Sequence, residues 1–104
     1  MNPSQPNAEQ KRWREIVRGL GHGQIIHHAI DRTMKIKGVG NIGHWWLVPC
    51  RDDYEHKAIH AMGRNRKPIE KLAFKRVCEA YRIRYSDEPP LPPGVYEAIM
   101  EFTR

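Results

Sequence analysis

The sequence predicts one small α+β domain, in which two short antiparallel strands and a helix are embedded among additional α-helices. Three observations lead to this prediction. The chain has 104 residues, which is enough for one modest hydrophobic core. Two short stretches near its middle, residues 24–30 and 45–48, are rich in β-branched or aromatic side chains. Segments with apolar residues at helical spacing precede and follow these stretches.

The N-terminal part of the chain is predicted to form a helix over residues 8–18, where apolar side chains recur at helical spacing. Gly19 and Gly21 are expected to end this helix, because glycine disfavours helical backbone. The first strand is predicted within residues 24–30, which contain the β-branched pair Ile25 and Ile26.

A basic, glycine-rich segment, residues 31–43, is predicted to be a loop. The second strand is predicted over residues 45–48, and Pro49 is expected to close it. Adjacent strand residues point to opposite faces. Of the neighbours Trp45 and Trp46, one is therefore expected in the core, and the other facing outward, where it packs beneath the terminal helix or stacks on a base.

A further helix is predicted after the second strand. Asp52 or Asp53 can cap its start, residues 54–62 can form it, and Gly63 can stop it. The predicted order is therefore strand, loop, strand and helix, over residues 20–63. This segment is expected to be the core of the domain.

The C-terminal part is predicted to add two helices to this core within one domain, residues 1–104. Residues 67–85 are expected to form a packing helix with Pro68 in its first turn. Residues 86–104 are expected to form a proline-rich connector and a short terminal helix. The apolar stripe predicted for the packing helix comprises Ile69, Leu72, Ala73, Val77, Ala80 and Tyr81.

The charge of the chain favours a polyanionic partner. Lys and Arg number 18 against 12 Asp and Glu, a net charge of +6. Nucleic acid is the leading candidate, and a membrane surface comes second. No long apolar run or signal-like segment is present, so a soluble, cytoplasmic protein is expected. Cys50 and Cys78 are isolated in sequence, which indicates reduced, buried thiols rather than a disulfide framework.

The histidines indicate metal chemistry, since all six lie between His22 and His60. His56 and His60 are four residues apart on a predicted helix, so both imidazoles can reach one ion. The same spacing also occurs on solvated helix faces. A zinc-protease site is disfavoured, because Lys57 stands where that motif needs a glutamate.

His27 and His28 form a second pair at the end of the first predicted strand. Their side chains should point to opposite faces, so one ring can bind an ion while the other acts as a general base. The alternative is that one ring packs in the core and the other is solvated.

Together these features resemble the HNH or ββα-metal endonuclease superfamily, and within it the small phage and prophage nucleases of the recombination-enhancement group. The resemblance covers residues 20–80 and rests on three segments: IHH at 26–28, GHWWLVPC at 43–50 and EHKAIH at 55–60. It implies a ββα-metal finger fold and hydrolysis of phosphodiester bonds in DNA.

The resemblance also implies roles for individual residues. His27, His56 and His60 would hold one divalent ion, while His28 would be the general base that takes a proton from water. Either His44 or Asn41 would orient that base. Imidazole ligands suit Zn²⁺, Ni²⁺, Mn²⁺ or Co²⁺ better than Mg²⁺, although Mg²⁺ is not excluded as the native ion.

Basic residues on both sides of this motif are expected to hold the phosphate backbone. They are Arg32, Lys35, Lys37, Arg64, Arg66 and Lys67. DNA is the expected partner, with RNA or branched DNA as further substrates, and the chain can act as a monomer or a homodimer.

Three other hypotheses compete with or extend this one. The same histidines can hold a structural zinc in a nucleic-acid-binding module that does not cut. The protein can instead act as a toxin-like or regulatory protein through its proline-rich tail. A second zinc between His22 and Cys50 is disfavoured, because two further ligands are missing.

Overall fold

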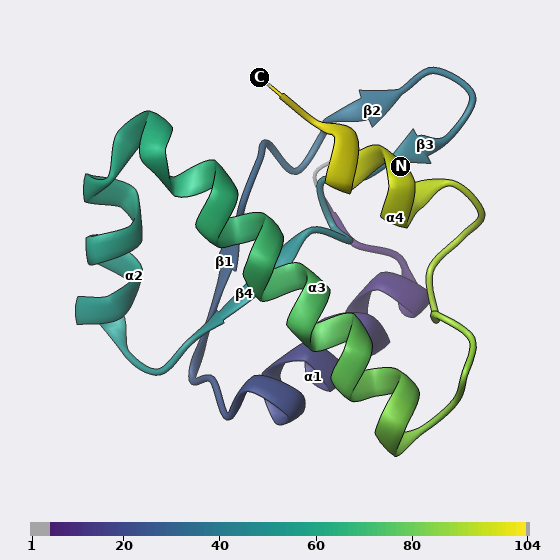
Figure 1. Cartoon of the computed structure of the whole chain (residues 1–104), viewed down its shortest axis with the longest axis horizontal. Helices are drawn as coiled ribbons and strands as arrows, with labels where there is room; N and C mark the ends of the chain where they lie inside the picture. Colours follow the sequence, from purple (N-terminus) through teal and green to yellow (C-terminus); the bar gives the residue numbers. More distant parts are fainter. Residues whose placement is uncertain (1–4, 104) are drawn as a thin grey trace.

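The structure, a computed structural model in which residues 5–103 are described, confirms the α+β class (Figure 1). It contains two small antiparallel sheets, and four α-helices surround them. Among the described residues, no helix has both the length and the apolar character needed to cross a bilayer. The elements are α1 (Ala8–Gly21), β1 (Ile25–His28), β2 (Lys35–Ile36), β3 (Gly40–Asn41), β4 (Leu47–Cys50), α2 (Asp53–Ala61), the 3₁₀ turn η1 (Gly63–Asn65), α3 (Arg66–Arg84) and α4 (Val95–Glu101).

The predicted order of strand, loop, strand and helix is confirmed by β1, β4 and α2. β1 pairs antiparallel with β4, with Ile25 opposite Cys50 and His28 opposite Leu47. Asp52 caps α2 through its side chain, which accepts a hydrogen bond of 2.9 Å from the N–H of Glu55. This cap starts α2 directly after β4 and sets the helix beside the strand pair.

The prediction that Pro49 closes the second strand was wrong, because Pro49 lies inside β4 opposite Ile26. Just beyond the end of β1, the N–H of Ala29 donates to the carbonyl of Trp46, so Ala29 and Trp46 form a hydrogen-bonded pair of the ladder. Hydrogen-bonded and non-hydrogen-bonded pairs alternate along an antiparallel ladder, so the pair of Pro49 and Ile26 is a non-hydrogen-bonded one. A proline is tolerated there because its missing N–H removes no ladder bond.

Two local predictions near these strands also need correction. α1 continues through Gly19 and ends at Gly21, the second of the two glycines expected to end it, and His22 caps the helix with a left-handed backbone, φ 51°. The segment expected to be a plain loop contains the hairpin β2–β3, which turns through Gly38 and Gly40 at φ 83° and 101°. Glycine adopts these angles without steric cost, so these glycines form a tight turn, and only the two short strands beside it were not expected.

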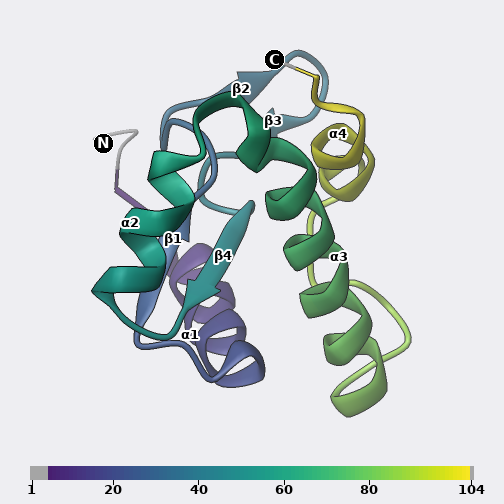
Figure 2. The same ribbon diagram turned by 60° about the vertical axis from the view of Figure 1, so that its left-hand side comes forward.

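The core lies between β4, α1 and α3, and α4 lies beside the β2–β3 hairpin (Figures 1 and 2). Trp13, Trp46 and Phe74 are among its largest fully buried side chains. Neither Trp45 nor Trp46 faces outward, since both are buried. The expected packing beneath the terminal helix is found, because the Trp46 ring lies edge-on against Phe102 at the end of α4, with ring centroids 5.7 Å apart. Trp45 and Trp46 lie in a turn before β4, where the Ile42 carbonyl accepts from both N–H groups, so strand alternation does not apply to them.

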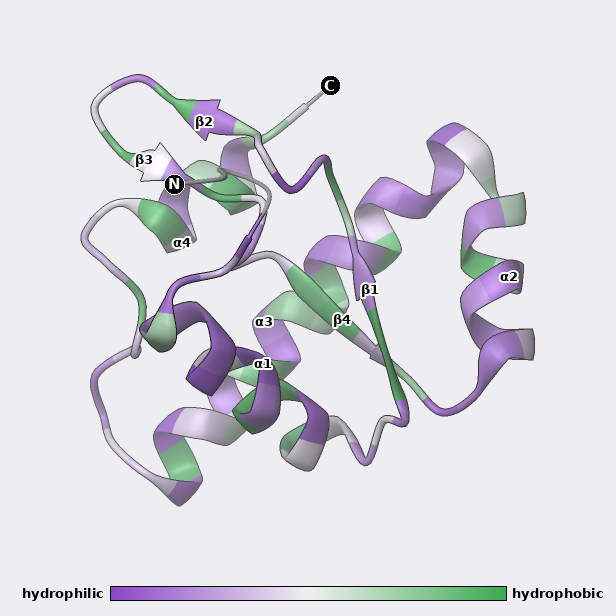
Figure 3. Ribbon diagram, turned by 180° about the vertical axis from the view of Figure 1, so that it is seen from behind, coloured by the Kyte–Doolittle hydropathy of each residue, from purple (hydrophilic) through white to green (hydrophobic). Residues whose placement is uncertain are grey.

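The buried face of α3 differs from the predicted stripe. Ile69 and Leu72 are 44% and 46% exposed. α3 buries Glu70, Phe74, Val77 and Cys78, of which Val77 alone was in the predicted stripe. Tyr81 of the stripe is partly buried and packs against the core. The predicted stripe excluded charged residues and therefore missed the face that contains Glu70. Figure 3 shows the apolar strand β4 near α1 and α3, whereas α2 is largely hydrophilic.

Two glycine substitutions test how tightly the segment after β1 packs. A Cβ on Gly43 would collide with the backbone of Asp31 and Arg32, whereas a Cβ on Gly19 meets nothing within 4 Å. We expect Gly43→Ala to lower the free energy of unfolding by about 1–3 kcal/mol. Gly19→Ala, in an exposed helical position, should raise it by about 0.5–1 kcal/mol. Urea unfolding measures both, and a Gly43→Ala protein as stable as the parent would contradict the packing described here.

Candidate metal centre

Three histidines from two elements converge at one point. His27 comes from β1, and His56 and His60 come from one face of α2. Their candidate ligand nitrogens all lie within 4.8 Å of one another. His56 Nε2 lies 3.1 Å from His27 Nδ1 and 3.2 Å from His60 Nε2. These three residues could therefore hold a metal ion, as the motif predicted for this group.

Two of the three separations between these nitrogens match those around a tetrahedral ion. Zinc–nitrogen bonds of about 2.0–2.1 Å at tetrahedral angles place two ligand nitrogens about 3.3 Å apart. The two separations through His56 Nε2, 3.1 and 3.2 Å, are close to that value. The set runs from buried His27 to exposed His60, so one side of the group faces solvent. Three protein ligands with a solvent-facing side leave a coordination position for water or substrate.

Glu70 on α3 fixes the orientation of His27. The Nε2–H of His27 donates to Glu70 Oε2 at 2.5 Å, and both side chains are buried, at 1% and 0% exposure. A carboxylate can only accept, so in the neutral form of His27 the proton is on Nε2 and the lone pair is on Nδ1. Nδ1 is the nitrogen that faces His56, so Glu70 presents His27 in the form that binds a metal.

Sequence reasoning missed Glu70, although a signal was present. The residues Phe74, Val77 and Cys78 follow Glu70 at helical spacing, and α3 buries all four. A charged residue on such a face is rarely fully buried unless it is paired. Arg66 and Lys67 accompany it, with Arg66 Nε 3.5 Å from Oε2 and Lys67 Nζ 3.9 Å from Oε1. A glutamate on an apolar helix face, next to a histidine motif, is the pattern that identifies such a partner.

His28 points away from the three-histidine group, as strand alternation predicted. Its ring packs edge-on against His44, with ring centroids 5.6 Å apart. Asn41, the other candidate for orienting His28, makes its side-chain hydrogen bonds to the backbone of Arg32 and His44. Its side chain donates to the carbonyl of Arg32 at 2.9 Å and accepts from the N–H of His44 at 3.1 Å. Asn41 thus shapes the turn that holds His44, and His44 is the residue that touches His28.

Two arginine side chains, Arg14 and Arg32, place positive charge near His28. Burial lowers the pKa of His28 to about 4, and the charges of Arg32, His44 and Arg14 add to the effect. The imidazole is therefore neutral at neutral pH and can accept a proton. Arg14 is a second residue that sequence reasoning missed, since α1 brings it to this place from outside the motif.

The six basic residues predicted to hold nucleic acid fall into two groups. Arg32 lies near His28, and the exposed Lys35 and Lys37 belong to the β2–β3 hairpin. Arg64, Arg66 and Lys67 line a cavity at the start of α3. Lys67 is held inward, because its Nζ donates to the carbonyl of Ala29 at 3.2 Å and lies 4.9 Å from the centre of the Trp46 ring.

Both isolated cysteines are buried and free, as expected. Burial raises the pKa of the Cys50 thiol to about 11, and the nearby carboxylates of Glu55 and Asp52 raise it further. Such a thiol stays protonated at neutral pH in the metal-free protein. Neither Cys50 nor His22 belongs to the three-histidine group, the candidate metal-binding group found among residues 5–103.

No protein-family model matches the chain, and neither the curated proteins nor the solved structures contain a significant match.

The contact between Glu70 and His27 can be tested through metal affinity. Glu70→Gln removes the negative charge that holds the Nε2–H of His27, so the binding of Zn²⁺ should weaken about 10–100-fold. A chelator competition measures the affinity. Glu79→Gln on the exposed side of α3 is the matched control and should leave it unchanged. Equal affinity of the Glu70→Gln variant and the parent would show that Glu70 does not position the ligand.

The low pKa of His28 predicts a dependence of stability on pH. Because the pKa is lowered in the folded protein from 6.5 to about 4, only the unfolded chain gains this proton as the pH falls through that window. The free energy of unfolding should therefore decrease from pH 6.5 to 4, by up to about 1.4 kcal/mol per pH unit for one proton.

Urea unfolding of metal-free protein between pH 4.5 and 7.5 measures this slope. His28→Asn should flatten it, whereas His22→Asn at the exposed end of α1 should not. His56, whose pKa is also lowered by burial and by His27 and His60, adds a contribution of the same sign that both variants retain. If the two variants have the same slope, His28 does not stay neutral in the fold.

Proposed function

We propose that the protein is a metal-dependent endonuclease of the HNH type, which hydrolyses phosphodiester bonds in DNA. The observation that carries this proposal is the convergence of His27, His56 and His60, next in sequence to a neutral, partly buried His28. Metal-dependent hydrolysis of a phosphodiester requires a metal ion with a free coordination position and a proton acceptor beside it. The net charge of +6 supports a polyanionic substrate.

In this proposal His28 accepts the proton of the water that attacks the phosphorus. The contact of His44 holds the ring of His28, while the cations Arg14 and Arg32 attract the phosphate to the same place. A bound phosphate would offset these cations and make His28 a stronger base. A divalent ion on the three histidines would stabilise negative charge on the phosphate and on the leaving 3′ oxygen.

The test is cleavage of supercoiled plasmid and of circular single-stranded DNA by purified protein, with Zn²⁺, Ni²⁺, Mn²⁺ or Mg²⁺. His28→Ala should lower the rate about 10²–10⁴-fold, because it removes the general base. It should keep the parent's metal stoichiometry. His60→Ala, at an exposed position, should lose metal and activity together. His22→Ala, which changes an exposed histidine outside the group, should cut like the parent.

Two outcomes would contradict the proposal. One is the absence of cleavage with every ion, and the other is equal cleavage by the parent and His28→Ala. Retained binding of zinc and DNA without cleavage would instead support a zinc-stabilised binding module.

A further inference from the structure

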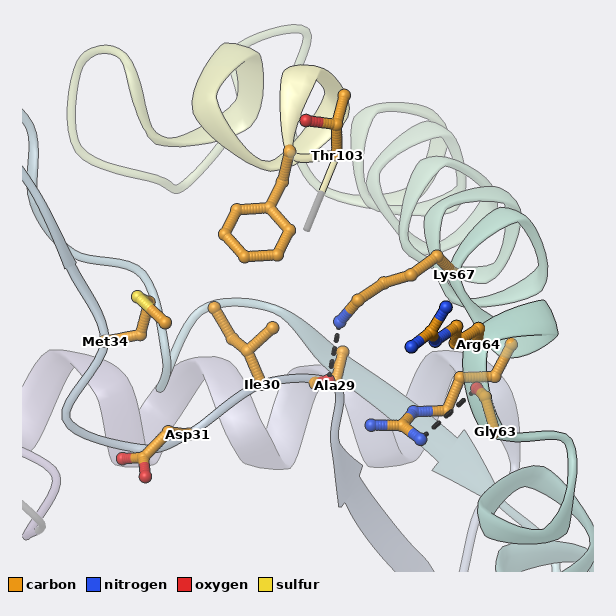
Figure 4. Close-up of a pocket in the computed structure, with 10 residues that line it drawn as sticks. Ala29, Ile30, Asp31, Met34, Gly63, Arg64, Lys67 and Thr103 are labelled. Carbon is orange, nitrogen blue, oxygen red and sulfur yellow. Dashed lines mark hydrogen bonds between the residues drawn. The ribbon is translucent and has the colours of Figure 1, made fainter.

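A cavity of about 780 Å³ opens between the segment that follows β1 and the start of α3 (Figure 4). One wall is formed by Ala29, Ile30 and Asp31, the residues that directly follow His28. The opposite wall is formed by Arg64, Arg66 and Lys67, which follow α2. The cavity therefore opens where the chain leaves both elements that carry the three histidines. Its volume is within the range of about 300–1,000 Å³ that is usual for small-molecule sites.

The two sides of the cavity differ in chemistry. The three basic residues line the side formed by η1 and α3. The apolar side chains of Ile30, Met34 and Phe102, all partly buried, line the remainder. Figure 4 shows the ammonium group of Lys67 directed at Ala29, with Ile30 and Met34 across the cavity from Arg64. A ligand that carries a phosphate at one end and a flat apolar ring at the other matches both sides.

Arg66 connects this cavity to the metal-binding group. Its Nε lies 3.5 Å from Glu70 Oε2, the oxygen that accepts from His27. Its Nη1 donates to the carbonyl of Gly63 at 3.3 Å. The Nε is buried and has no hydrogen-bond partner among the described residues. A phosphate held by Arg66 would thus lie beside the residues that position the metal ligands.

We propose that this cavity binds a nucleotide next to the scissile phosphate, with its phosphate on Arg64 and Arg66 and its base against Ile30, Met34 and Phe102. The proposal rests on the nuclease function proposed above and specifies its substrate. A base inside a duplex is paired and stacked on both faces, so entering the cavity requires that it be flipped out at a cost. An unpaired strand bears no such cost. The preferred substrate is therefore single-stranded or frayed DNA.

Electrostatic attraction to the phosphates alone would not favour the single strand over the duplex. A duplex carries more phosphates per unit length than a single strand, so a purely electrostatic surface binds the duplex at least as well. A preference for single strands therefore reports contacts to bases, which stack on aromatic and apolar side chains whatever their sequence.

The experiment measures binding rather than cleavage, so its outcome is separate from that of the nuclease test. Fluorescence anisotropy compares three labelled DNAs of equal length: a single strand, the blunt duplex, and a strand of abasic sugar phosphates. Zn²⁺-loaded His28→Ala protein is used, and gels verify that the DNA stays intact. We expect the single strand to bind about tenfold or more tightly than either of the other two.

Arg64→Glu should weaken binding of the single strand about tenfold, since it reverses a charge at the exposed rim of the cavity. Arg76→Glu makes the same charge change at an exposed position of α3 outside the cavity, and should change affinity less than threefold. Phe102→Ala should reduce the advantage of the normal strand over the abasic strand.

The inference is overturned if the duplex or the abasic strand binds as tightly as the single strand, or if the Arg64 and Arg76 variants lose affinity equally. A clear preference for the normal single strand without cleavage by the parent protein would support the cavity and contradict the nuclease.

Discussion

The hydrogen bond between His27 and Glu70 is the interaction on which the rest of the site depends. It joins β1 to α3 across 43 positions of sequence, and both side chains are fully buried. A buried carboxylate without a partner would be very costly, so the position of α3 relative to the strand pair is coupled to the orientation of one imidazole. Arg66 and Lys67 lie beside the same carboxylate. Glu70 therefore contacts the three-histidine group through His27 and the basic wall of the cavity through Arg66 and Lys67.

The parts of the structure that sequence predicted are those determined locally. The order of strands and helix, the cap at Asp52 and the facing pair His56 and His60 follow from the period and chemistry of neighbouring residues. The parts that sequence missed depend on distant residues. Glu70 is explained only by His27, and Arg14 reaches His28 from α1. The β2–β3 hairpin was missed for a different reason, since strands of two residues carry no readable alternation.

The divergence of His27 and His28 gives two adjacent residues different environments. His27 is held by a carboxylate and faces other imidazoles, whereas His28 lies among Arg32, His44 and Arg14. In the proposed reaction, one phosphate must therefore approach both rings at the end of β1. Because Arg14 and Arg32 lie near His28, the negative charge of a bound phosphate would offset their positive charges. His28 would gain basicity only when a phosphate is bound, which limits proton uptake in the free protein.

The exposure of the metal-binding group bears on whether an ion there would be structural or reactive. Structural zinc sites are closed by four protein ligands. Among residues 5–103, the group comprises three histidines, and two of them lie on α2, which buries no residue. α2 therefore relies little on the apolar core for its position, and an ion shared by His27, His56 and His60 would tie this helix to β1. In the proposed function, the solvent-facing side of the same ion would also meet the phosphate, so one ion would both hold α2 in place and take part in the reaction.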